Sequence, residues 1–223
     1  MKRSALFAFL CAAAALSAPA ADPTSPEIAN QSIRCANLVY AGTETSRCFS
    51  DQFLSSMQNL AAIPTERRFK SVKLADDELF QFPFVVMTGE SSFSLPAKER
   101  ENLLKYLSSG GFVLASAGCS SADWDKAFRR ELRRIFPDRE LETIPPDHPV
   151  FHTVSDVDRL ELSHEAPDAS LQGLSLGDKI VLIYSRHGLN DTAHAEGCCC
   201  CGGNEIKNAL AVNVNILAYA LLH

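Results

Sequence analysis

The stretch from Phe84 to Ala115, FVVMTGESSFSLPAKERENLLKYLSSGGFVLA, decides the fold that the sequence predicts. It begins with the apolar run 84–87, which is typical of a strand buried on both faces. A helix is then predicted from Pro96 to Gly110, and a second buried strand follows at 112–115. A strand, a helix and another strand in this order form a unit in which the two strands run parallel.

The same alternation continues on both sides of this stretch. A strand is predicted at 35–40 and a helix over 49–63, where apolar residues recur at helical spacing. Ser121 is expected to cap the helix that follows the second buried strand. A buried strand at 180–184 and a helix over 206–221 close the chain. We therefore expect an α/β fold with a doubly wound, mostly parallel sheet between two layers of helices.

The beginning of the chain is typical of a secretory signal peptide. Lys2 and Arg3 precede an apolar run at 5–16, which is too short to span a hydrocarbon core of about 30 Å. Ala18-Pro19-Ala20 has the small-x-small form of a signal peptidase site, so we expect cleavage after Ala20. The expected organisation is a signal peptide at 1–20, a short linker at 21–33 and a single domain at 34–223. Export to the periplasm or medium follows, and no later segment is long and apolar enough to span a bilayer.

Composition limits the classes of partner. The formal net charge is -6, and it becomes more negative when the basic residues of the signal are removed. An acidic protein is poorly suited to binding phosphate backbones, so we expect no nucleic acid partner. The expected partner is a small ligand or another protein.

Four segments resemble the bacterial family catalogued as domain of unknown function 4159. They are FVVMTG at 84–89, YLSSGGF at 106–112, PDHPVFH at 146–152, and the closing Asn-containing helix that ends in AYA at 218–220. The resemblance spans about Arg34 to Leu222. It implies a fold similar to class I glutamine amidotransferases, with a doubly wound sheet of the flavodoxin type, and it implies no established activity.

Cysteine and histidine gather in the loops that follow the predicted strands. Open α/β sheets bind ligands beyond the carboxyl ends of their strands. Cys48 follows the first strand, and Cys119 follows the strand at 112–115. The loop after the last strand holds His187, Asp191, His194, Glu196 and the run Cys198 to Cys201. Free cysteines are uncommon in exported proteins, where they become disulfides or metal ligands.

One interpretation of these residues is a metal site. Cys198 and Cys201 have the Cys-x-x-Cys spacing, which lets two sulfurs reach one ion. Cys119 or Cys48, together with His194 or His187, would complete a set of soft donors. Zinc and copper(I) prefer such thiolate and imidazole ligands, so either metal is the expected cofactor.

A second interpretation is structural. The cysteines at 198–201 would pair with Cys35, Cys48 and Cys119, or with one another, in disulfides that fix the edge of the sheet. A bridge that closes a long loop is worth about 2–4 kcal/mol.

A third interpretation is catalysis by an amidotransferase-like cysteine hydrolase. Cys119 would be the nucleophile, because it follows a central strand, and His194 with Glu196 would be the base and the group that orients it. A thiol–disulfide exchange role for Cys198 and Cys201 is a further possibility. The sequence leaves open whether the protein is an enzyme.

The signal peptide gives the first testable expectation. Intact-mass measurement of protein recovered from the periplasm or medium should show a chain that begins at Ala21, or within two residues of it. Recovery of the intact chain from Met1 in the cytoplasm would contradict the assignment.

Overall fold

The fold is built on one mixed sheet, seen in a computed structural model that describes residues 32–42, 51–163, 169–189 and 205–223. Within those residues the sheet has seven strands in the order β2-β1-β3-β4-β7-β6-β5. Their bounds are β1 Cys35–Val39, β2 Lys70–Lys73, β3 Phe84–Gly89, β4 Phe112–Ala117, β5 Glu142–Thr143, β6 Leu171–Leu176 and β7 Lys179–Ser185. The five strands from β2 to β7 in this order are parallel to one another. At the β7 side of the sheet, β6 runs antiparallel to β7, and β5 runs antiparallel to β6.

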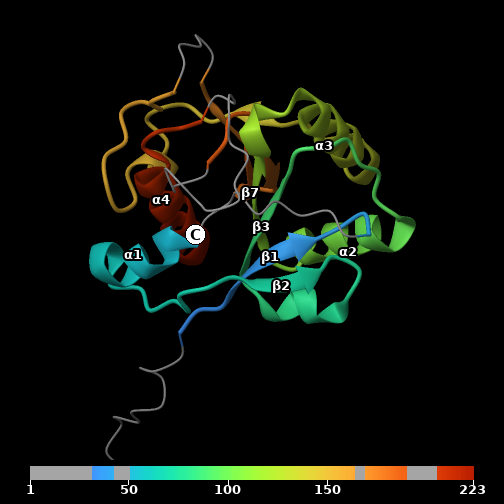
Figure 1. Cartoon of the computed structure of the whole chain (residues 1–223), viewed down its shortest axis with the longest axis horizontal. Helices are drawn as coiled ribbons and strands as arrows, with labels where there is room; N and C mark the ends of the chain where they lie inside the picture. Colours follow the sequence, from blue (N-terminus) through green and yellow to red (C-terminus); the bar gives the residue numbers. More distant parts are fainter. Residues whose placement is uncertain (1–31, 43–50, 164–168, 190–204) are drawn as a thin grey trace, which may run out of the picture. The chain divides into compact units, whose positions relative to one another are not determined.

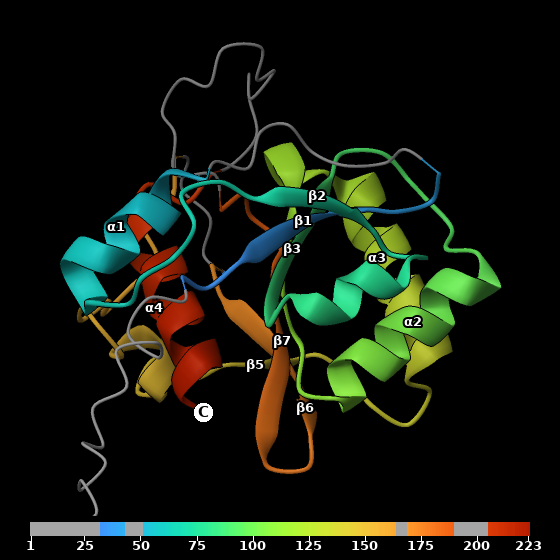
Figure 2. The same ribbon diagram turned by 90° about the horizontal axis from the view of Figure 1, so that it is seen from below.

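Helices cover both faces of the sheet (Figure 1). They are α1 Gln52–Ala61, α2 Ala97–Ser108, α3 Ala122–Ile135 and α4 Ala209–Leu222. The sheet has a hydrophobic cluster on each face: α2 and α3 pack on one face, and α1 and α4 pack on the other. The view in Figure 2 shows the same division, with α1 and α4 on one side of the strands and α2 and α3 on the other. The expected α/β fold with a mostly parallel sheet is confirmed.

The central strands explain why their sequence is continuously apolar. All six residues of β3 and all six of β4 are buried, because each strand has neighbours on both sides and helices on both faces. Between them, α2 buries Leu103 and Leu107 but leaves Leu104 41% exposed, so the three leucines do not form one buried stripe as their helical spacing suggests. The predicted cap of α3 is confirmed, since the Trp124 amide donates to Ser121 Oγ over 3.3 Å.

Strands at the sides of the sheet were not predicted. Each of the four residues of β2, KSVK, is exposed except the valine, so its apolar signal is a single residue. The β6–β7 hairpin turns at Gly177, whose φ of +63° is accessible to glycine at no steric cost. The two-residue β5 lies at the edge of the sheet in the irregular, proline-rich middle of the chain, where prolines permit only short edge strands.

Asparagines of α4 hold that irregular middle segment in place. The Asn215 amide donates to the Phe151 and Ser155 carbonyls, and its carbonyl oxygen accepts from the Val154 and Ser155 amides. All four hydrogen-bonding positions of a buried side chain are therefore used. No helix in the described part of the chain is long and apolar enough to cross a membrane.

A close approach at Gly89 ties β1, β3 and α3 together. The Tyr40 hydroxyl donates to the Thr88 carbonyl over 2.9 Å and accepts from Trp124 Nε1 over 2.6 Å. A Cβ at position 89 would lie 2.3 Å from the Tyr40 hydroxyl and 2.6 Å from Trp124 Nε1. Only glycine leaves room for this arrangement at the end of β3.

Replacing Gly89 with alanine should therefore destabilise the fold through overpacking. We expect the Gly89→Ala variant to lose about 2–3 kcal/mol of unfolding free energy, measured by urea denaturation. Gly110→Ala is the control: it meets no atom within 4 Å, although its φ is +94°. That control should lose only about 1 kcal/mol, from backbone strain. Equal losses of unfolding free energy in the two variants would contradict the idea that close contact with Tyr40 and Trp124 excludes a side chain at position 89.

Candidate functional site

The parallel strands β1, β3, β4 and β7 end at one side of the sheet, which we call the carboxyl edge. From β1 the chain adds β2 on one side and then crosses back to add β3 on the other, so strand order reverses between β1 and β3. Ligands of open α/β sheets bind beyond the strand ends at such a reversal. The residues that leave these strands are the first candidates for a site.

The turn from β4 into α3 places Cys119 at this edge. Cys119 has φ 50° and ψ 29°, and Ser120 has φ 52°, so two consecutive non-glycine residues adopt left-handed conformations. Such conformations are costly and are found preferentially at functional sites. Before them, a Cβ at Gly118 would lie 3.1 Å from the Gly89 carbonyl oxygen, which keeps the turn close to the end of β3. Ser121 adds a hydrogen bond from its hydroxyl to the Glu90 carbonyl.

His187 leaves the neighbouring strand at the same edge. Its carbonyl accepts a hydrogen bond from Ser116 Oγ over 3.3 Å, and Ser116 Oγ accepts from the Leu189 amide over 3.0 Å. The exit from β7 is thus attached to the end of β4, three residues before Cys119. The structure therefore places the predicted thiol and the predicted imidazole on adjacent strand ends.

The described residues on either side of the cysteine-containing segment lie next to each other. Gly188 and Glu205 form a parallel bridge, and the Ile206 amide donates to the Gly188 carbonyl over 2.9 Å. A Cβ at Gly188 would lie 1.8 Å from a carboxylate oxygen of Glu205, so a larger residue there would require the Glu205 side chain to move. The described residues that flank 190–204 therefore meet near the end of β7.

The other predicted site residues lie outside the described residues. His194, Glu196, Cys198 and Cys201 fall in segment 190–204, and Cys48 falls in segment 43–50. Within the part of the chain that the structure describes, no group of three His, Cys, Asp or Glu side chains is arranged to hold a metal ion.

Cys35 differs from Cys119 in its surroundings. It lies in the core of the α1 and α4 face, and burial raises the pKa of its thiol to about 12. A thiol must ionise before it can bind a metal or act as a nucleophile, so Cys35 is suited to neither task. Cys35 is a free thiol in the structure, so the expected disulfide through Cys35 is not seen. Cys119, in contrast, is partly exposed.

Three small hydroxyl side chains lie side by side below the carboxyl edge. Thr88 of β3 is paired with Ser116 of β4, and Ser116 is paired with Ser185 of β7. Two residues earlier in each strand, the side chains pack in the cluster under α1 and α4. Because side chains alternate along a strand, the three hydroxyls face α4 as well. We call Thr88, Ser116, Ser185 and the facing Asn213 of α4 the polar strip.

Several oxygens of the polar strip have no hydrogen-bond partner among the residues that the structure describes. Thr88 is 1% exposed, and Ser185 and Asn213 are 0% exposed. Thr88 Oγ1, Ser185 Oγ and Asn213 Oδ1 are buried and unpaired, although Asn213 Nδ2 donates to the Leu189 carbonyl over 2.9 Å. Buried polar atoms are almost always paired, so three exceptions at one place indicate a position for a bound molecule.

The polar strip was missed in the sequence, although a signal was present. Thr88 and Ser116 each come one residue before the end of a buried strand, and Ser185 ends the next one. A hydroxyl at the same position in three apolar strands is the pattern that would have predicted it.

Comparisons with known proteins give a family and no activity. The model of the family described as "Domain of unknown function (DUF4159)" matches residues 34–221. A comparison with curated proteins finds no match.

Two substitutions distinguish an unpaired hydroxyl from a paired one. In protein dialysed free of small molecules, Thr88→Val should raise the free energy of unfolding by about 1 kcal/mol, because it removes an unpaired buried oxygen without changing the side-chain shape. Ser116→Ala should lower it by about 1–2 kcal/mol, because it removes the partner of the Leu189 amide. Urea denaturation measures both values. If Thr88→Val is destabilised as much as Ser116→Ala, the Thr88 hydroxyl makes a hydrogen bond in the folded protein.

Proposed function

We propose that this chain, which belongs to the DUF4159 family over residues 34–221, is an exported metal-binding module whose site lies at the carboxyl edge. The metal would be zinc or copper(I). Cys119 and His187 would supply a thiolate and an imidazole from neighbouring strand ends, and His194, Cys198, Cys201 and Cys48 would supply the remaining ligands. The observation that supports the proposal is the bridge between Gly188 and Glu205, which brings the described residues on either side of the cysteine-containing segment together near the end of β7.

Chain length supports this ligand set. Cys201 precedes Glu205 by four residues, and a fully extended chain advances at most about 3.6 Å per residue. Cys201 is therefore held within about 14 Å of the bridge between Gly188 and Glu205. The thiol of Cys119 enters from the adjacent strand end, so ligands far apart in sequence can meet at one ion.

The fold also suits this site. The strand order β2-β1-β3-β4-β7 with helices on both faces is the order of a doubly wound sheet of the flavodoxin type. We infer that the chain shares its three-layer arrangement with class I glutamine amidotransferases. The polar strip lies just below the metal position and offers hydroxyl and amide oxygens to a molecule bound there.

A second candidate is an amidotransferase-like hydrolase, and the backbone at Cys119 favours it. Cys119 lies in a left-handed backbone conformation in the strand-to-helix turn, which is the kind of position that a nucleophilic cysteine occupies. In this mechanism His194 takes the thiol proton and Glu196 orients the imidazole, so that the thiolate attacks a carbonyl carbon.

Metal content distinguishes the two candidates. Protein purified without chelator should carry about one equivalent of zinc or copper by elemental analysis, as a single tetrahedral site requires. Replacing Cys198 and Cys201 together with serine should remove most of it, and Cys119→Ser or His187→Ala should weaken its retention during dialysis. Occupancy should also fall below about pH 6, because thiolates and imidazole must lose protons to bind.

Cys35→Ala is the matched cysteine control, because its buried, protonated thiol cannot be a ligand. It should keep the metal, as should His223→Ala at the end of the chain. The hydrolase predicts the reverse pattern: negligible metal in every variant, and a single rapid reaction of Cys119 with iodoacetamide that His194→Ala slows. Retention of metal by the Cys198→Ser, Cys201→Ser double variant would refute the ligand set.

A further inference from the structure

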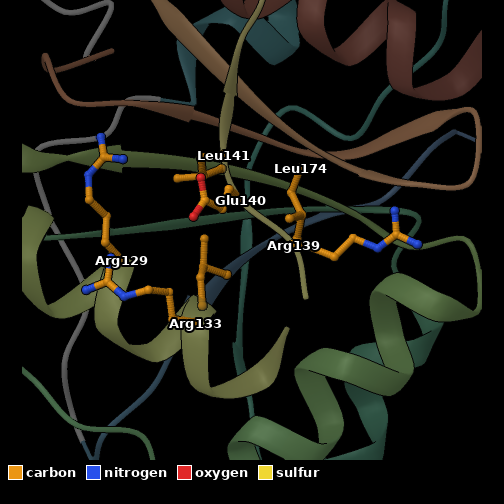
Figure 3. Close-up of a pocket in the computed structure, with 7 residues that line it drawn as sticks. Arg129, Arg133, Arg139, Glu140, Leu141 and Leu174 are labelled. Atoms are coloured by element: carbon orange, nitrogen blue, oxygen red, sulfur yellow. The ribbon is translucent and has the colours of Figure 1, made fainter. Parts of the chain in front are cut away.

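A second site lies away from the carboxyl edge, between α3 and β6. The cavity has a volume of about 160 Å³ and is lined by Arg129, Leu132, Arg133, Arg139, Glu140, Leu141 and Leu174 (Figure 3). Because α3 begins at the carboxyl edge and runs back along the sheet, its second half lies toward the opposite edge. This cavity is thus separate from Cys119 and the polar strip.

Arg129 is held in place before any ligand binds. Its Nε donates to Asp125 over 2.7 Å and its Nη2 to Gln172 over 2.5 Å, and its guanidinium lies 5.0 Å from the ring centre of Tyr184. A guanidinium has five N–H donors in a fixed plane, so three remain available. A fixed guanidinium loses little freedom when it binds a carboxylate or phosphate.

Arg133 adds charge at the same end of the cavity. It follows Arg129 by four residues, which places both side chains on one face of α3. It makes no hydrogen bond or ion pair with any described residue, whereas Arg130 and Arg134 both bind Glu131. Arg129 is already paired with Asp125, so Arg133 is the arginine whose charge has no partner among the described residues, and a bound anion would supply one.

The rest of the lining sets the shape of the ligand. Leu132, Leu141 and Leu174 form an apolar floor. Figure 3 shows the Glu140 carboxylate near the middle of the cavity, and the Arg139 side chain extending away from Arg129 and Arg133. A ligand whose charge lies at the Arg129 and Arg133 end would extend its apolar part over the leucines.

We propose that this cavity binds a small organic anion, a carboxylate or phosphate group carried on a short apolar body. The anionic group is bound by Arg129 and Arg133, and the apolar body rests on Leu132, Leu141 and Leu174. Glu140 opposes the anion, so it limits affinity. Arg139 contributes little because its guanidinium extends away from the other two.

Titration of the whole mature protein with hexanoate tests the proposal, with backbone amide NMR as the measurement. Hexanoate should shift the amides of Leu132, Leu141 and Leu174, and hexyl phosphate should do the same. Acetate keeps the carboxylate but lacks the apolar chain, and hexan-1-ol keeps the chain but lacks the charge. Each should bind at least tenfold more weakly than hexanoate. Arg133→Ala should weaken hexanoate binding about tenfold, as expected when a charge-assisted hydrogen bond is lost.

Two neighbouring variants serve as controls. Arg139→Ala should change hexanoate affinity less than threefold, and Glu140→Gln should increase it, because a like charge is removed. Hexan-1-ol that binds as well as hexanoate would overturn the proposal, because it would show an apolar cavity without anion recognition. An Arg133→Ala variant with native affinity, or an Arg139→Ala variant as weak as Arg133→Ala, would also overturn it.

Discussion

The hydrogen bonds of the Tyr40 hydroxyl, in the space left by Gly89, are the constraint on which the carboxyl edge depends. This hydroxyl joins the end of β1 to the backbone of β3 and to the indole of Trp124 in the first turn of α3. Since α3 starts at Ala122, three residues after Cys119, fixing Trp124 also restrains the turn that contains Cys119. The left-handed conformations of Cys119 and Ser120 persist because the elements on either side of them cannot move apart.

The parallel centre of the fold could be predicted because its signals are local. Buried strands such as β3 and β4 are continuous apolar runs, and the glycines after α2 mark its end. The side strands could not be predicted in this way. β2 contributes one buried residue, and β6 is recognised as a strand only through its pairing with β7. Likewise, Leu60 fits a helical apolar stripe but is 53% exposed.

The candidate site was predicted only in part, because the sequence shows which residues follow a strand but not how the strands are aligned. The rule that ligands bind at strand ends selected Cys119 and His187, and the structure places both at the carboxyl edge. The polar strip depends on the register between strands, which no single segment contains. The cavity on α3 brings together residues from a helix, a loop and a strand, so its arginines look like an ordinary solvated helix face in the sequence.

The central claim is that a metal binds at the carboxyl edge between the ends of β4 and β7. Backbone amide NMR of the dialysed protein titrated with zinc tests it most directly. The account predicts that amides of residues 118–121 and 186–189 shift most, with saturation at about one equivalent, as one tetrahedral site requires. His148 and His223, whose rings both contact Tyr219, offer zinc another place to bind. Shifts confined to those histidines, with residues 118–121 and 186–189 unchanged, would contradict the account.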